Sequence, residues 1–152
     1  MRATVLPWLR AALVLVLVLA LDQLTKHAVE SSIASGEERA FLPGVELVHT
    51  RNRGVAFGIL PGDTLAVTIL ICVAVAALLA YFAHTRERPL MWLPTGMIAG
   101  GALGNIVDRL RHGFVTDFIK LPLGWPPFNL ADASITLGVL ALLVLVDRAR
   151  HA

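Results

Sequence analysis

Residues 96–135, GMIAGGALGNIVDRLRHGFVTDFIKLPLGWPPFNLADASI, decide the fold and the chemistry that we predict for this chain. The stretch begins and ends as an apolar helix, yet its polar and charged side chains include Asn105, Asp108, Arg109, Asp117, Asn129 and Asp132. Ionisable groups near hydrocarbon cost roughly 2.5–3.5 kcal/mol each on insertion scales, so their presence indicates a function. We predict that this stretch delivers carboxylates to an active site at a membrane surface.

Three glycines of the same stretch, Gly96, Gly100 and Gly104, are spaced four residues apart on one helical face. This spacing lets the backbone of a neighbouring helix approach closely, where lipid supplies no hydrophobic drive for association. The first helix of the stretch is therefore expected to pack tightly against another helix.

The composition indicates one integral membrane domain over residues 1–152. Apolar residues make up 57% of the chain, charged residues 16%, and the mean hydropathy is +0.73, whereas soluble domains are about 45–50% apolar. The formal charge of +2 is small and scattered, which excludes a nucleic-acid partner. Because Cys72 is the only cysteine, there is no intramolecular disulfide framework and no CxxC metal site.

Four apolar runs predict four transmembrane helices, each close to the ~20 residues that cross a ~30 Å hydrocarbon core. The helices are expected at about 9–27, 64–83, 90–110 and 130–146. The basic start of the first run and the small residues at Ser32–Ala34 could also describe a cleaved signal peptide. The charged end of that run and the three further spans favour a retained helix.

The polar segment between the first two helices, residues 28–62, is expected to lie outside the membrane. Residues 31–39 read as a loop or a surface helix, and the partly alternating, β-branched pattern of residues 41–50 predicts short strands. An isolated hairpin is marginal in water, so a small sheet resting on the membrane is better supported. Residues 111–128 are expected to form a loop.

The distribution of Lys and Arg favours a cytoplasmic location for both termini. The two termini and the turn at residues 84–89 hold six of these residues, and the other two connecting segments hold seven over more than twice the length. The density of positive charge therefore favours cytoplasmic termini, although the raw count does not.

With four crossings, the polar groups at the helix ends all emerge on one face, together with residues 28–62. They are Asp22, Asn105, Asp108, Asp117, Asn129 and Asp132. The alternative is that they are ordinary capping or snorkelling residues, which would suit Asn129 ahead of the fourth helix. Capping suits the acids at the C-terminal ends of the first and third helices poorly, because the helix dipole disfavours negative charge there.

These groups permit only some kinds of hydrolysis. HExxH and zinc-spaced His or Cys clusters are absent, which argues against a metalloprotease, and we expect neither a metal nor another cofactor. GxSxG is absent too, and a Ser134–Lys120 pair has no spacing rule behind it. Two aspartates that share a proton could activate a water and polarise a carbonyl. The residue pattern leaves three candidates for this pair, Asp108, Asp117 and Asp132.

Five blocks in the chain resemble, in order, the motifs of the bacterial lipoprotein signal peptidase (signal peptidase II) family. They are Asp22-Gln-x-Thr-Lys26, Asn52-x-Gly-x-Ala-Phe57-Gly58, Gly100-Gly-Ala-x-Gly-Asn105-x-x-Asp108-Arg109, Val115-x-Asp117-Phe118 and Phe128-Asn129-x-Ala-Asp132. Each block is weak alone, but five in the family's order are specific, and the resemblance covers the whole chain. Departures are small. Ala133-Ser134 reverses the Ser-Ala order that is common in the family, and Arg53 is bulkier and more basic than the residue that many members carry at this position.

The resemblance implies an intramembrane aspartyl endopeptidase that cleaves diacylglyceryl-modified prolipoproteins just before the lipidated cysteine. The family's catalytic dyad maps onto Asp117 and Asp132. Its supporting residues map onto Asp22, Lys26, Asn52, Gly54, Asn105, Asp108, Arg109 and Asn129. The family also implies a β-cradle and a surface helix within residues 28–62, and a monomeric, multi-pass protein of the bacterial inner membrane. Its site lies near the outer leaflet, contacts membrane lipid and is open to a peptide antibiotic such as globomycin.

Two functions of other classes remain as alternatives. A small carrier or ion relay would use the same aspartates for protons or cations, but it needs acids near the bilayer midplane that face both compartments. A purely structural membrane subunit would tolerate replacement of Asp117 and Asp132.

Overall fold

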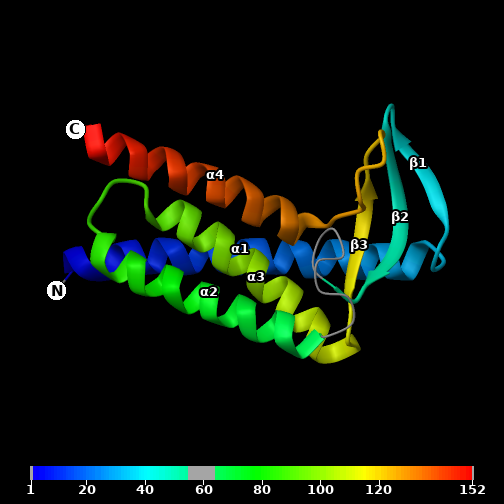
Figure 1. Cartoon of the computed structure of the whole chain (residues 1–152), viewed down its shortest axis with the longest axis horizontal. Helices are drawn as coiled ribbons and strands as arrows, with labels where there is room; N and C mark the ends of the chain where they lie inside the picture. Colours follow the sequence, from blue (N-terminus) through cyan, green and yellow to red (C-terminus); the bar gives the residue numbers. More distant parts are fainter. Residues whose placement is uncertain (1, 55–63, 152) are drawn as a thin grey trace.

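The computed structural model describes residues 2–54 and 64–151, with the backbone alone at residues 2–4 and 64. Phe57 and Gly58 of the second motif lie outside the described residues. The elements in order are α1 (Arg2–Ser32), β1 (Glu38–Leu42), β2 (Val45–Asn52), α2 (Thr64–Thr85), α3 (Trp92–His112), β3 (Val115–Lys120) and α4 (Leu130–His151). Figure 1 shows the helices bundled lengthwise, the sheet across one end and both termini near the other. The mostly helical fold with a small β element is confirmed.

Three of the described helices are long and apolar enough to cross a membrane, over Val5–Ser32, Leu65–Thr85 and Leu130–His151. The fourth, α3, contacts α1, α2 and α4 and is buried along much of its length. A helix surrounded by other helices does not need an apolar surface all round, and α3 carries glycines and polar residues instead. The prediction of four long helices is confirmed, whereas a crossing by α3 stays a prediction.

The first helix is longer than the sequence pattern indicated, because α1 continues to Ser32 instead of ending near residue 27. Its last turns carry Val29, and the chain leaves it through Ile33. Both side chains are buried against Phe118 of β3. Among the described residues between α1 and α2 there is no separate surface helix, and residues 33–37 form a turn before β1.

The sheet has three antiparallel strands in the order β1-β2-β3. Leu47 of β2 pairs with Ile119, and Thr50 pairs with Asp117. The expectation that residues 111–128 form only a loop is therefore wrong, since Val115–Lys120 is a strand. Its partner lies more than sixty residues earlier in the chain, so the pairing that stabilises β3 leaves no local signal.

The glycines of α3 hold the bundle together closely. A Cβ at Gly96 would lie 2.6 Å from the carbonyl oxygen of Ala11, and one at Gly100 would lie 2.8 Å from that of Leu15. The expected close approach of a neighbouring helix is confirmed, and the neighbour is α1. A further glycine, Gly101, faces α4 instead, where a Cβ would meet the carbonyl oxygen of Ala131 at 2.5 Å.

Gly101→Ala is expected to push the first turn of α4 away from α3. Overpacking of this kind costs about 1–3 kcal/mol, and a shift of about 1 Å at a catalytic group can cost about 100-fold in rate. The measurements are thermal stability in micelles and cleavage of a precursor substrate. Gly113→Asn is the control, because Gly113 has a left-handed φ of 76° that Asn tolerates and no atom lies within 4 Å of its Cβ position. Equal activity of both variants would contradict the packing argument.

Candidate active site

The structure brings all ten predicted site residues to the end of the bundle that carries the sheet (Figure 1). They come from every element that reaches this end except β1 and α2. The set comprises Asp22 and Lys26 of α1, Asn52 and Gly54 at the end of β2, Asn105, Asp108 and Arg109 of α3, Asp117 of β3, and Asn129 and Asp132 at the start of α4. The hydrogen bonds below connect them into one network.

A buried ion cluster joins α1 to α3. The Nζ atom of Lys26 lies 2.8 Å from a carboxylate oxygen of both Asp22 and Asp108, and it donates to Asn105 Oδ1 at 3.0 Å. All four side chains are buried. Gln23 donates to the second oxygen of Asp108 at 2.9 Å. Asp108 is thus paired with a buried cation, which suits a structural carboxylate that joins α1 to α3.

The N-terminus of α4 is capped by the residues that the sequence placed there. Asn129 Oδ1 accepts from the backbone N–H of Asp132 at 2.9 Å, and Asp132 Oδ2 accepts from that of Asn129 at 3.4 Å. This reciprocal pair is of the capping-box type. From α1, Asp22 Oδ1 accepts from the backbone N–H of Ala131 at 2.9 Å. Capping therefore does account for part of the role of Asn129 and Asp132.

Capping does not explain the other contacts of the Asp132 side chain. Its Oδ1 accepts from the side-chain amide of Asn105 at 2.8 Å, and its side chain is half-buried on the wall of a cavity. A residue needed only as a cap has no reason to take a second donor from another helix. The Asp132 carboxylate is thus held by donors from Asn105 and Asn129, and the residue lines the cavity.

Asp117 is held rigidly on β3. One carboxyl oxygen accepts from Asn129 Nδ2 at 2.7 Å, the other accepts from Asn52 Nδ2 at 2.9 Å, and the side chain is only 2% exposed. Burial raises the pKa of Asp117 to about 7, the negative charge of Asp132 adds to the rise, and the two amide donors oppose it. A carboxyl with this pKa keeps a proton close to neutral pH.

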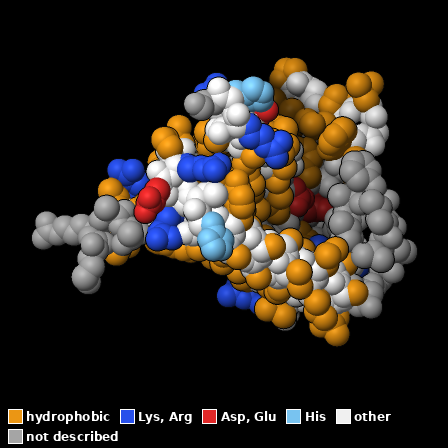
Figure 2. Space-filling model, turned by 60° about the vertical axis from the view of Figure 1, so that its left-hand side comes forward, with side chains coloured by type: hydrophobic (Ala, Val, Ile, Leu, Met, Phe, Trp, Pro, Cys, Tyr) orange, Lys and Arg blue, Asp and Glu red, His pale blue; other side chains and the backbone are white. Residues whose placement is uncertain are grey.

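A cavity of about 980 Å³ opens beside these groups. Its polar wall contains Asn52, Asn105, Arg109 and Asp132. Its apolar walls are Val67, Leu70 and Ile71 of α2, Ile135 and Leu137 of α4, and residues 125–128. Figure 2 shows acidic side chains in a recess between hydrophobic surfaces. The cavity therefore joins a polar floor to the apolar faces of two helices.

Arg109 lines this cavity, and one of its donors has no partner among the described residues. Its guanidinium donates to the backbone oxygens of Asn105 at 3.2 Å and Gly54 at 3.1 Å. Its Nε is buried and has no hydrogen-bond partner among the described residues. Buried N–H groups are almost always paired, so this unpaired N–H is unusual.

Two contributors were not predicted from the sequence. Gln23 bridges Asp22, Asp108 and the carbonyl oxygen of Gly104, although only its neighbours were named as site residues. Its position three residues before Lys26, on the same face of α1, is a signal that could have found it. Thr116, whose backbone N–H lies 3.4 Å from Asp108 Oδ2, depends on β3 and had no such signal.

The chain is similar in sequence and in fold to known proteins. A sequence model of the family described as signal peptidase (SPase) II matches residues 14–147. The lipoprotein signal peptidase of Syntrophomonas wolfei is 44% identical over 86% of this chain and 87% of its own length. That of Halothermothrix orenii is 41% identical over 88% and 91%. A solved bacterial membrane enzyme is similar with a TM-score of 0.85 and 30% identity, covering 91% of this chain and 87% of that one. These matches over most of the chain show that it belongs to the signal peptidase II family and is a peptidase.

Proposed function

We propose that the protein is an aspartyl endopeptidase that removes the signal peptide from diacylglyceryl-modified prolipoproteins, just before the lipidated cysteine. The curated relatives are named lipoprotein signal peptidases, which supports the substrate class. Asp117 and Asp132 form the catalytic pair. Asp22, Lys26, Asn52, Gly54, Asn105, Asp108, Arg109 and Asn129 hold that pair or bind the peptide.

One observation carries the assignment of the pair: Asn129 contacts both carboxyls. Its side-chain amide donates to Asp117 and its backbone N–H donates to Asp132. A single residue thus keeps the two groups near each other, in a site where Asp117 retains a proton near pH 7. Asp108 differs from this pair because it forms a buried salt bridge with Lys26, whereas neutral amide and backbone donors hold Asp117 and Asp132.

The pair holds one proton because two adjacent buried carboxyls resist a second negative charge. The ionised carboxylate takes a proton from a water as the water oxygen attacks the scissile carbonyl carbon. The protonated carboxyl donates its proton to the carbonyl oxygen. When the tetrahedral intermediate collapses, the C–N bond breaks and the amine leaves with a proton from the carboxyl that received one. No covalent bond to the enzyme forms in this sequence.

Arg109 and Asn52 position the peptide. The guanidinium of Arg109, a residue that lines the cavity, suits a peptide carbonyl oxygen. The apolar walls of the cavity on α2 and α4 suit the acyl chains of the substrate, which reach the site laterally through the bilayer. The four helices cross the bacterial inner membrane with both termini in the cytoplasm and the site near the outer leaflet. The protein acts as a monomer without a cofactor, and a cyclic peptide such as globomycin would compete for the same cavity.

Removal of the lipid from the substrate tests the proposed substrate class. A precursor without diacylglycerol is expected to be cleaved about 100-fold more slowly, because it lacks the acyl chains that contact the apolar walls of the cavity and so place the scissile bond. The measurement compares kcat/KM for the two precursors in the same vesicles, where the signal peptide anchors both. Equal values would contradict the proposed substrate class and leave the peptidase assignment intact.

A further inference from the structure

Arg53 is a charged residue on the wall of the cavity that the proposed mechanism does not use. It is exposed, follows β2 directly and lines the cavity of about 980 Å³. The residue before it, Asn52, donates to Asp117 at 2.9 Å. The residue after it, Gly54, accepts from Arg109 at 3.1 Å through its backbone oxygen. Arg53 is therefore an immediate neighbour, along the chain, of two residues that contact the proposed site.

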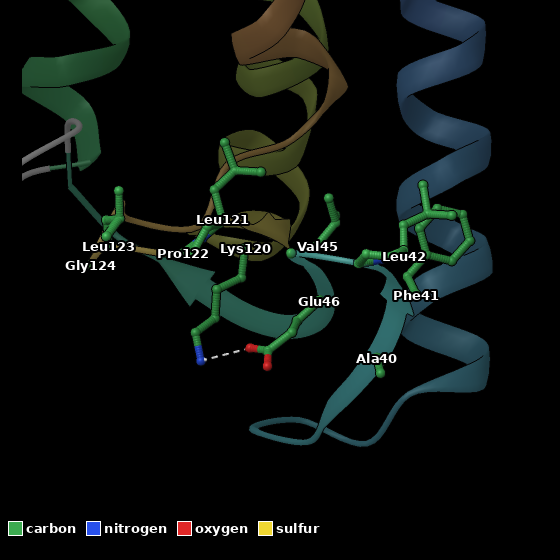
Figure 3. Close-up of a pocket in the computed structure, with 12 residues that line it drawn as sticks. Ala40, Phe41, Leu42, Val45, Glu46, Lys120, Leu121, Pro122, Leu123 and Gly124 are labelled. Carbon is green, nitrogen blue, oxygen red and sulfur yellow. Dashed lines mark ion pairs between the residues drawn. The ribbon is translucent and has the colours of Figure 1, made fainter.

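The positive charge of Arg53 is not compensated within the described part of the chain. The other Lys and Arg residues of the sheet each have a partner: Lys120 pairs with Glu46 and Glu38, Arg39 pairs with Glu37, and Arg51 lies over the ring of Phe114. Figure 3 shows one of these pairs, in which Lys120 Nζ lies 3.1 Å from a carboxylate oxygen of Glu46. Among the described residues, Arg53 forms no ion pair and lies over no aromatic ring. Its guanidinium is thus left with water.

A substrate in the cavity would remove part of this water. Among the described residues that line the cavity, only Arg53, Arg109 and Asp132 are charged, and most of the others are apolar. Arg109 interacts with the negative charge of Asp132, whereas Arg53 has no such acid. A cation that loses water without gaining an anion costs free energy, and an arginine can bind a carboxylate through two charge-assisted hydrogen bonds. Arg53 therefore favours a substrate that brings its own acidic side chain.

The fold indicates which part of the substrate passes Arg53. The apolar walls of the cavity on α2 and α4 belong to helices that are apolar enough to cross a membrane, and they suit the acyl chains. Arg53 instead lies next to the sheet, which crosses the end of the bundle (Figure 1). The segment that follows the lipidated cysteine leaves the membrane on this side. Each residue of an extended chain spans about 3.3–3.6 Å, so the first two residues of that segment stay close to the scissile bond.

We propose that Arg53 selects precursors that carry an acidic side chain at one of the first two positions after the lipidated cysteine. The guanidinium binds this carboxylate while the scissile bond lies at Asp117 and Asp132. Arg53 is then a specificity-determining residue that takes no part in proton transfer. The inference rests on the proposed function, since it assumes cleavage of a lipidated precursor, and it adds a preference that the catalytic pair alone does not supply.

The test uses three lipidated precursors that differ only at these two positions, which hold Asp-Asp, Asn-Asn or Lys-Lys. Cleavage is measured for the wild type, Arg53→Gln, Arg53→Glu and Arg51→Glu, in vesicles of phosphatidylcholine with and without phosphatidylglycerol. Arg51→Glu is the matched control, because it makes the same charge change two residues earlier, at a residue of β2 that does not line the cavity. Ratios of kcat/KM within one enzyme cancel any general loss of activity, and thermal melting checks that each variant is folded.

The wild type is expected to cleave the Asp-Asp precursor with a kcat/KM about tenfold higher than the Lys-Lys precursor, with Asn-Asn between them, since one precursor gains an ion pair and the other a repulsion. The difference should lie in KM, because the pair is the same before and in the transition state. Arg53→Gln should bring the ratio to about one, and Arg53→Glu should reverse it. Arg51→Glu should keep the wild-type order.

Equal cleavage of the three precursors by the wild type, or a wild-type ratio in Arg53→Gln, would overturn the inference. The same loss of preference in Arg51→Glu would also overturn it, because the effect would then belong to the general charge of this surface. If Arg53→Gln slows all three precursors equally, and only in vesicles with phosphatidylglycerol, Arg53 binds a lipid headgroup and the inference is wrong. Failure of the wild type to cleave any lipidated precursor would contradict the proposed function itself, and the inference with it.

Discussion

Asp117→Asn and Asp132→Asn are each expected to lower the cleavage rate of a lipidated precursor by about 100- to 10,000-fold, the range that general acid–base groups contribute. An amide can neither take a proton from water nor donate one as an acid. Both variants should remain folded in the membrane, because Asn has nearly the same shape as Asp and keeps one of the two oxygens that accept hydrogen bonds. The measurement is single-turnover cleavage in vesicles.

The matched control for these two variants is Asp147→Asn. Asp147 lies on α4 like Asp132, but its side chain is 72% exposed near the opposite end of the helix. The Asp147→Asn variant should cleave the lipidated precursor at the wild-type rate. Full activity in either Asp117→Asn or Asp132→Asn would refute the proposed pair and favour the carrier or the structural subunit.

The raised pKa of Asp117 also predicts the sign of a stability effect. In the unfolded chain its pKa is about 3.8, and in the fold it is about 7. The fold therefore binds the proton more tightly, so this contribution to stability is complete below pH 3.8 and is lost as the pH rises through 7. Asp117→Asn removes this loss, so the stability of the inactive variant should stay constant as the pH rises through 7, where that of the wild type falls. Thermal melting of both proteins at each pH measures this difference and separates loss of activity from unfolding.

Lys26→Met is expected to have the largest effect on stability. The change leaves Asp22 and Asp108 as buried carboxylates without their cation, and breaking a buried pair by removing one partner costs about 3–5 kcal/mol. Unfolding in mixed micelles should report this loss. A second change, Asp108→Asn, should restore part of the stability because it removes one unpaired charge.

Lys120→Met provides the comparison for the buried lysine. Lys120 forms ion pairs with Glu38 and Glu46 at the surface of the sheet, where both acids are about half exposed. Exposed pairs contribute about 0–1 kcal/mol, so this variant should be nearly as stable as the wild type. Similar losses for Lys26→Met and Lys120→Met would show that the Lys26 cluster does not hold α1 to α3.

Much of this architecture could be predicted because its causes are local in the sequence. Long apolar runs predict the helices, the four-residue spacing of Gly96 and Gly100 predicts the contact with α1, and the order of the runs predicts that the polar ends meet. The pattern around Asn129 and Asp132 likewise predicts a helix start. Each of these features depends on residues within one or two turns of each other.

The parts that could not be predicted depend on contacts between distant segments. The strand Val115–Lys120 exists because β2 pairs with it, and the isolated segment reads as a loop. The close contact at Gly101 depends on where α4 begins. Apart from the family resemblance, the sequence does not choose among Asp108, Asp117 and Asp132, because the partners of each carboxyl come from distant segments.

The central claim is that Asp117 and Asp132 are coupled and hold one proton between them. Infrared difference spectroscopy of the carboxyl C=O band, titrated in vesicles, measures this directly. The wild type is expected to show a protonated carboxyl that ionises with an apparent pKa of about 7, and Asp117→Asn should lack this band. In Asp132→Asn the same titration should move to lower pH, because the charge that helps to raise the pKa of Asp117 is gone. An unchanged titration in Asp132→Asn, or the same band persisting in Asp117→Asn, would contradict the account.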